Sequence, residues 1–139
     1  MSIEENIAVV RRIVEEAFNK GNLSVITELM APHYIYHGAA GMKIEGIEGM
    51  ERLVMRLRTA LPDLHVTIED IFGWEDKVAA RLTYRGTHEG EWVNIHPTGK
   101  EIAATEIMIV HWQGGKEVES WGVFDRYGAM QQLGIVPTN

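Results

Sequence analysis

The chain has 139 residues, 45% of them hydrophobic and 24% charged, which is enough to fold as one domain, 1–139, around a sizeable core. Its net charge of −7 argues against nucleic acid or an anionic membrane surface as the main partner. It has no cysteine, no stretch of the roughly 20 apolar residues that cross a membrane, and no signal peptide, so disulfides and thiol chemistry are excluded and a cytoplasmic protein is predicted.

The N-terminal part of the chain predicts two helices. An apolar stripe with helical spacing predicts the first over residues 3–20, opened by a capping box of Ser2 and Glu5. The second is short, with Asn22 as its N-cap and Pro32 closing it.

A short extended segment and a third helix follow. Residues 33–37 alternate, so that Tyr34 and Tyr36 share one face of the segment. Residues 38–49 are rich in glycine but lack the spacing of a phosphate-binding loop, and they predict a mobile rim. An apolar stripe then predicts a helix over about 47–60.

From Leu64 onward the apolar residues recur with a period of two, which predicts strands joined mostly by hairpins. Gly114 and Gly115 supply the positive φ angles of a tight hairpin. After Asp125 the spacing becomes helical until Gly134. Helices grouped apart from an antiparallel sheet predict an α+β domain in which a curved sheet wraps the three helices and leaves a cavity.

Asp125 is the first candidate catalytic residue. It ends the strand that begins at Glu117, on the same face as Trp121, so it could be a carboxylate buried beside an aromatic ring. Such a group has a raised pKa and can act as a general acid or base near neutral pH. The alternative is a surface ion pair or a cap for the terminal helix.

His111 and Glu106 compete as the neighbour of Asp125. A two-residue hairpin pairs Gln113 with Lys116, which puts His111 on the face away from Trp121 unless a bulge intervenes. The same register puts Glu106 and Met108 on the Trp121 side. The residue pattern therefore favours Glu106 as the neighbour of Asp125, and it leaves undecided whether His111 is a structural or a catalytic histidine.

Other polar residues are weaker candidates. His37 sits between a tyrosine-rich strand and a glycine-rich loop, as a residue at a pocket mouth would. His88 and Arg81 lie on opposite faces of one strand, so only one of them can enter a cavity. The histidines are scattered and lack the spacing of a metal-binding helix, so we predict no metal site.

Six segments, taken in this order, resemble the SnoaL-like polyketide (ester) cyclase family, and together they cover nearly the whole chain. They are 34–37 (YIYH), 61–63 (LPD), 84–90 (YRGTHEG), 97–100 (PTGK), 121–125 (WGVFD) and 131–134 (QQLG). Two departures from the family pattern could reshape the pocket. They are the segment 94–96 before Pro97, and Glu106 in place of a neutral residue.

The resemblance implies a cone-shaped α+β fold, shared with ketosteroid isomerases, around one deep pocket. It implies a homodimer or homotetramer that closes a ring in an apolar, carbonyl-containing small molecule by aldol condensation, without a metal or cofactor. Asp125 matches the family's acid/base aspartate, and His37 and His111 match its pocket histidines. The expected substrate-binding residues are Trp121, Tyr36, Met108, Glu106, His88 and Arg81.

Two other readings of function remain. A hydratase, isomerase or epoxide hydrolase could use the same fold, and the epoxide case would need Asp70 and Arg81 as partners of Asp125. A non-catalytic small-molecule-binding or dimerisation domain is the other alternative.

Overall fold

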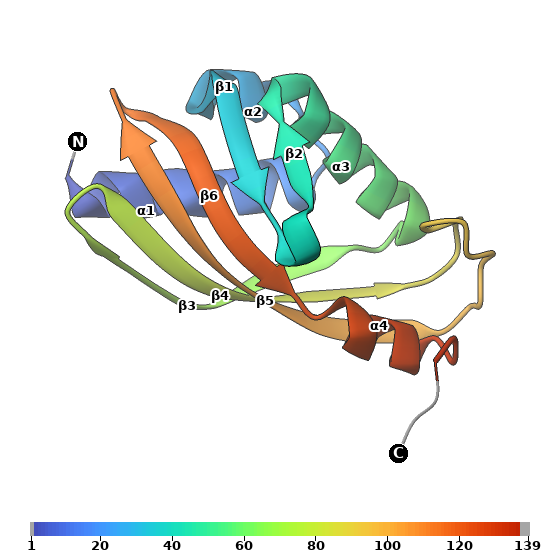
Figure 1. Ribbon diagram of the computed structural model, residues 1–139. Coiled ribbons are helices and arrows are strands. Elements are labelled where there is room, and N and C mark those ends of the chain that lie inside the picture. The colour runs from blue at the N-terminus through green and yellow to red at the C-terminus, as the bar shows by residue number, and fades with distance from the viewer. Residues whose placement is uncertain (1, 137–139) are drawn as a thin grey trace.

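The computed structural model describes residues 2–136, which form helices on the concave side of a curved sheet (Figure 1). The helical segments are α1 (Ile3–Arg12), the π-helix η1 (Ile13–Phe18), α2 (Ser24–Leu29), the short 3-10 turn η2 (Ala39–Gly41), α3 (Gly46–Ala60) and α4 (Arg126–Gln132). The strands are β1 (Met30–His37), β2 (Lys43–Glu45), β3 (His65–Trp74), β4 (Lys77–Thr87), β5 (Glu101–Gln113) and β6 (Lys116–Phe124).

The first predicted helix is confirmed as one helical run, but it changes its hydrogen-bonding pattern halfway. The Ser2–Glu5 capping box opens α1, and the chain continues directly into the π-helix η1. Such wide turns are rare and are often found at functional sites. Here the wide turn carries Ile13, Val14 and Phe18, which line the cavity described below.

The end of the second predicted helix is wrong. Helix α2 ends at Leu29, and β1 begins at Met30, so that Pro32 lies inside a strand. The pairing of β1 with β6 is irregular between Met30 and Ile35, and β2 pairs only with the later part of β1. This gap in the ladder accommodates a proline, which has no N–H to donate. Within the predicted loop 38–49, residues of β2 complete the sheet edge.

The α+β class and the curved sheet are confirmed, with one difference in strand direction. The strand order is β2-β1-β6-β5-β4-β3. Neighbours pair antiparallel except β1 and β6, which are parallel. The parallel contact joins the N-terminal half of the chain to its last strand, and hairpin patterns do not reveal such a long connection.

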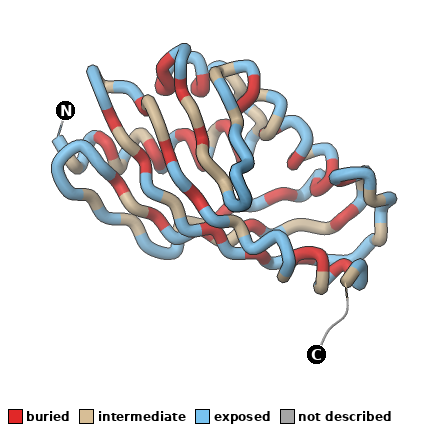
Figure 2. The backbone as a smooth tube through the Cα atoms, in the orientation of Figure 1, coloured by how far each residue is buried: buried red, intermediate tan, exposed pale blue. Residues whose placement is uncertain are grey.

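The two faces of the sheet differ sharply, as the alternating buried and exposed residues along the strands show (Figure 2). The inner face packs on η1, α2 and α3 in one large apolar core, and on α1 in a second, smaller cluster of Val10, Val78, Val110 and Trp112. On β4, Val78, Ala80, Leu82 and Tyr84 face inward and are buried, in agreement with the predicted period of two. The outer face leaves large apolar side chains in solvent, including Phe72, Trp74 and Val123.

A bulge in β6 changes the predicted faces of that strand. Gln113 pairs with Lys116 as predicted, but Trp112 pairs with Glu117 while His111 pairs with Glu119, so Val118 is an extra residue. The extra residue turns Glu117 to the inner face. The inner face of β6 therefore carries Glu117, Ser120, Gly122 and Phe124, and the outer face carries Glu119, Trp121 and Val123.

Two of the recognised segments, 61–63 and 84–90, meet at the end of α3 and hold β4 against it. Thr87 donates to Asp63 from its backbone N–H at 2.7 Å and from its hydroxyl at 2.8 Å. A Cβ on Gly90 would stand 2.0 Å from the carbonyl oxygen of Thr59, so only glycine fits there. Within residues 2–136, no helix is long and apolar enough to cross a membrane.

Candidate active site

A cavity of about 430 Å³ lies between the inner face of the sheet and the helices. Its lining is mostly apolar. One end is closed by buried residues of α1 and η1, including Val10 and Val14. At the other end the lining includes solvent-exposed residues of three different segments, Met42, Val93 and Arg126, which mark the mouth.

Glu106 is the polar centre of this cavity. Its carboxyl accepts a hydrogen bond from the Tyr36 hydroxyl at 2.5 Å and another from the Tyr84 hydroxyl at 2.8 Å. The three side chains come from β5, β1 and β4, and all three line the cavity. Glu106 is only 5% exposed. A buried carboxyl held by two phenols, with apolar walls around it, is a typical acid/base site.

Burial sets the proton affinity of this group. Loss of solvation raises the pKa of Glu106 above its ordinary value, and the hydrogen bonds from Tyr36 and Tyr84 offset part of that rise. The pKa of both tyrosines is raised in turn, first by burial and then by the nearby Glu106 charge. The phenols therefore keep their protons and act as hydrogen-bond donors.

Gly122 on β6 makes room for this arrangement. A Cβ at this position would stand 2.6 Å from the Tyr36 hydroxyl oxygen and 2.9 Å from Glu106 Oε2. It would also stand 2.9 Å from Tyr36 Cε2, and all three contacts are with side chains and none with the backbone, so a larger residue would displace the Tyr36–Glu106 pair.

We expect Gly122→Ala to fold normally and to separate Tyr36 from Glu106, lowering turnover by about tenfold to a hundredfold because the acid/base group is misplaced. Circular dichroism checks the fold and a turnover assay checks the rate. Gly114→Ala is the control, because Gly114 lies in the hairpin outside the cavity. Its φ of 61° means that this substitution strains the backbone without touching the site. Full activity of Gly122→Ala would contradict this role.

A second carboxyl, Glu117, also lines the cavity. It is 4% exposed, and burial raises its pKa to about 8. Near it, the Tyr34 hydroxyl and the Ser120 hydroxyl share a hydrogen bond between β1 and β6. The cavity therefore holds two buried carboxyls, Glu106 and Glu117, while a third lining carboxyl, that of Glu91, is exposed.

Of the predicted site residues, Tyr36, Met108 and Glu106 line the cavity. The predicted interior position of Asp125 and Trp121 is wrong. Trp121 is 41% exposed on the outer face, and Asp125 is exposed and caps α4 by accepting the backbone N–H of Gly128 at 2.9 Å. The β6 bulge and the alternation of side chains after it explain both positions.

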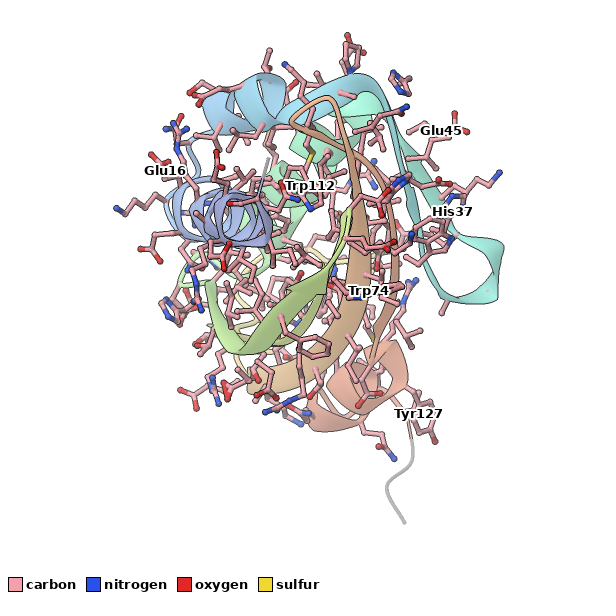
Figure 3. The ribbon with its side chains drawn as sticks, turned by 90° about the vertical axis from the view of Figure 1, so that its left-hand side faces the viewer. Glu16, His37, Glu45, Trp74, Trp112 and Tyr127 are labelled. Atoms are coloured by element: carbon pink, nitrogen blue, oxygen red, sulfur yellow. The ribbon has the colours of Figure 1, made fainter. Side chains whose placement is uncertain are left out.

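His37 and His111 do not meet Asp125 or enter the cavity. Both lie on the outer face of the sheet. The His37 ring Nε2 forms a hydrogen bond with the Glu119 carboxylate at 2.6 Å, and the ring stacks on Trp121 at a centroid distance of 5.5 Å. The His111 ring Nε2 forms a hydrogen bond with the Asp76 carboxylate at 2.9 Å. Figure 3 shows His37 on the side of the sheet away from α1.

His88 is buried and Arg81 is exposed, but His88 lies just beyond the end of β4 at Thr87, and neither residue lines the cavity. His88 is fully buried, but its Nδ1 is engaged by Thr98 in the loop before β5, and it does not line the cavity. Arg81 forms an ion pair with Asp70 at 2.8 Å on the outer face, and neither residue lines the cavity as the epoxide hydrolase alternative would need. Within residues 2–136, no three His, Asp or Glu side chains are grouped to hold a metal ion.

Sequence reasoning missed Tyr84, Gly122 and Glu117. The alternation along β4 could have shown that Tyr84 points inward, but only the β4–β5 register shows that it lies beside Glu106. Gly122 has no side chain to signal a role. Glu117 was hidden because the bulge at Val118 reverses its face.

The chain is similar over most of its length to known proteins. The family model for SnoaL-like polyketide cyclases matches residues 8–133. Aklanonic acid methyl ester cyclase AcmA of Streptomyces galilaeus is 29% identical over 136 residues, covering 95% of this chain and 92% of AcmA.

Solved structures agree with this match. AclR, a putative hydroxylase from Streptomyces galilaeus, has a TM-score of 0.87 at 28% identity, over 99% of this chain and 89% of AclR. IdmH, a putative polyketide cyclase from Streptomyces antibioticus, has a TM-score of 0.80 at 29% identity, over 91% of this chain and 96% of IdmH.

Proposed function

This chain belongs to the SnoaL-like polyketide cyclase family, and from that premise we propose that it closes a carbon ring in an apolar polyketide ester, with Glu106 as the acid/base group. The observation that carries the proposal is the buried Glu106 carboxyl, held by the Tyr36 and Tyr84 hydroxyls in a mostly apolar cavity. The proposed reaction is an intramolecular aldol addition.

The proposed chemistry needs only one proton carrier. Ionised Glu106 takes a proton from the carbon next to a carbonyl group, and the electron pair of that C–H bond moves into the enolate. The enolate carbon then bonds to a ketone carbon, and the pair of the C=O π bond moves to the ketone oxygen. That oxygen receives the proton from Glu106, so the product is an isomer of the substrate.

The two phenols support each stage. While Glu106 is ionised, Tyr36 and Tyr84 orient it through their hydrogen bonds. Once it holds the substrate's proton it accepts more weakly, and the phenol protons can stabilise the enolate oxygen instead. The apolar walls, including Met108 and Phe124, exclude water that would compete for these protons.

The experiment that tests this function is incubation with aklanonic acid methyl ester, on which the relative AcmA acts, and with other polyketide methyl esters. Ring closure is expected to give a product of unchanged mass with a new retention time and absorption spectrum. If no polyketide ester reacts while the folded protein binds them, the chain is a binding protein and the proposal fails.

An isomerase would begin with the same proton transfer, and only the product separates it from a cyclase. Proton return to a different carbon would give an isomer without a new ring, which nuclear magnetic resonance of the product distinguishes. The catalytic role of Asp125 stays a prediction. Asp125 is exposed and caps α4, so the geometry favours Glu106.

We also propose that the outer sheet face binds a second copy of the chain, giving the homodimer or homotetramer predicted from the sequence. One row of cross-strand neighbours runs across five strands. It consists of Phe72, Ala79, Ile109, Trp121 and His37. Monomeric proteins rarely leave so continuous an apolar strip in solvent.

Charges on both sides of this strip suit a copy related by a two-fold axis. One flank carries the Asp70–Arg81 pair, and the other carries the Asp76–Lys77 pair and Glu119. Because each flank presents both signs, a rotated copy can place opposite charges together around the apolar row.

We expect the wild-type chain to sediment as a dimer or tetramer, and Trp121→Glu with Val123→Glu to sediment as a monomer, because burying two added carboxylates is costly. Met55→Glu is the matched control, since Met55 is 57% exposed on α3, away from the sheet. A wild-type chain that sediments as a monomer at high concentration would overturn this proposal.

A further inference from the structure

The closed end of the cavity contains a carboxyl that the proposed reaction does not use. Glu117 is 4% exposed and lines the cavity together with Val10, Val14 and Met30. It reaches this position only because Val118 bulges out of the β5–β6 ladder. Without the bulge, simple alternation would place Glu117 on the outer face beside Glu119.

Among the described residues, no hydrogen bond to the Glu117 carboxyl is found, and burial alone accounts for its raised pKa. Its cross-strand neighbour on β5, Trp112, has a buried indole Nε1–H that also lacks a partner. Figure 3 shows Trp112 on the side of the sheet that faces α1. Buried polar groups are nearly always hydrogen-bonded, so an unpaired carboxyl facing a cavity indicates a ligand group that pairs with it.

The surroundings favour the protonated form of this carboxyl at neutral pH. The walls from α1 and η1 are apolar, and among the described residues no cation contributes to the shift in the pKa of Glu117, which burial alone raises. Tyr34 is the titratable group beside it, and burial keeps the pKa of Tyr34 well above its ordinary value, so Tyr34 stays neutral. Burying an ionised carboxylate here would be costly.

We propose that Glu117 forms a second polar subsite at the closed end of the cavity and, as a neutral acid, donates a hydrogen bond to an uncharged oxygen at the far end of the substrate. This inference deepens the proposed function, because it concerns the same cavity. It assigns the substrate class as an elongated, mostly apolar molecule with a ketone, ester or quinone oxygen at each end.

The order of residues along β6 supports this length. From the closed end to the mouth, the inner face presents Glu117, Ser120, Gly122 and Phe124, followed by Arg126. Glu106 and Tyr36 meet at the level of Gly122. Between Gly122 and Glu117 the β5–β6 ladder advances four residues, from Met108 to Trp112, so at about 3.3 Å per residue Glu117 lies roughly 13 Å along the strand from that level. One ligand can therefore reach both carboxyls only if it is extended.

The test compares two probes that differ in one carbonyl. 2,6-Diacetylnaphthalene carries an oxygen acceptor at each end, and 2-acetylnaphthalene carries one. Their dissociation constants are measured by quenching of protein fluorescence at pH 6.5 and pH 9.5. We expect the wild-type chain at pH 6.5 to bind the diketone about tenfold more tightly than the monoketone, because it gains one buried hydrogen bond.

Variants of Glu117 test whether this residue causes the tighter binding of the diketone. Glu117→Leu should remove it while leaving monoketone binding intact, and Glu117→Gln, which keeps a neutral N–H donor, should retain it at both pH values. In the wild-type chain the preference should disappear at pH 9.5, where Glu117 is ionised. An unchanged preference in Glu117→Leu would overturn the subsite, and so would tighter binding of an analogue with an amine in place of the second ketone.

Failure of this inference is distinguishable from failure of the proposed function. The probes report binding only, so a diketone preference that depends on Glu117 stands even if no substrate is turned over. Conversely, ring closure that depends on Glu106 stands even if both probes bind equally.

Discussion

Glu106→Gln is expected to lower turnover at least a hundredfold, and up to about ten-thousandfold, with little change in substrate binding. Glutamine has the shape of glutamate but cannot carry the substrate's proton, and general acid–base catalysis contributes about 10²–10⁴ in rate. The Tyr36 and Tyr84 hydroxyls can still donate to the amide oxygen, so the cavity should keep its form.

The measurement is kcat and KM for the polyketide ester that the wild-type chain cyclises, with circular dichroism as a check of folding. Glu101→Gln is the control, since Glu101 is an exposed residue of the same strand. A folded Glu106→Gln variant with wild-type kcat would remove Glu106 from the mechanism.

Glu117→Gln is expected to stabilise the protein by an amount that grows with pH. The pKa of Glu117 is raised from 4.5 to about 8 on folding, so its neutral form fits the folded state and its stability contribution is fully present only below pH 4.5. That contribution is lost as the pH rises through 8, whereas glutamine does not titrate. The advantage of Glu117→Gln should therefore grow by roughly 3–4 kcal/mol between pH 5 and pH 9.

Urea denaturation of both chains at pH 5 and pH 9 gives the two free energies of unfolding. Glu106 titrates in both chains, so its contribution cancels in the difference. Glu101→Gln, which changes an exposed glutamate of β5, is measured alongside as the control for the Glu-to-Gln exchange itself. A constant difference for Glu117→Gln would mean that Glu117 is not buried as a neutral acid.

Much of the fold was predictable because local patterns determine it. The capping box fixed the start of α1, the Gly114–Gly115 turn fixed the β5–β6 hairpin, and alternation gave the inner face of β4. The bulge at Val118 and the parallel β1–β6 contact were not predictable in this way. Both depend on pairing between segments, and neither leaves a periodic signal.

The recognised segments identified the family because they hold the fold together. Asp125 caps α4, Thr87 ties β4 to Asp63, and Gln132 exchanges hydrogen bonds with the backbone of Ala103. These contacts are structural. The resemblance therefore predicted the fold well, while the position it suggested for the acid/base group is on the protein surface.

The candidate site needs four strands brought together. Tyr36, Tyr84, Glu106 and Gly122 are far apart in the chain, and each is ordinary in its local sequence. Only the register of β1, β4, β5 and β6 shows that they meet. The simple hairpin register nominated Glu106 for the cavity on the wrong assumption that Trp121 also faced it.

The most direct test of the account measures turnover of one polyketide ester by Glu106→Gln and Asp125→Asn side by side. Asparagine caps helices as well as aspartate does, so both variants should fold. We expect at least a hundredfold loss for Glu106→Gln and a change of no more than a few-fold for Asp125→Asn. A large loss in a folded Asp125→Asn variant, with Glu106→Gln still active, would contradict this expectation.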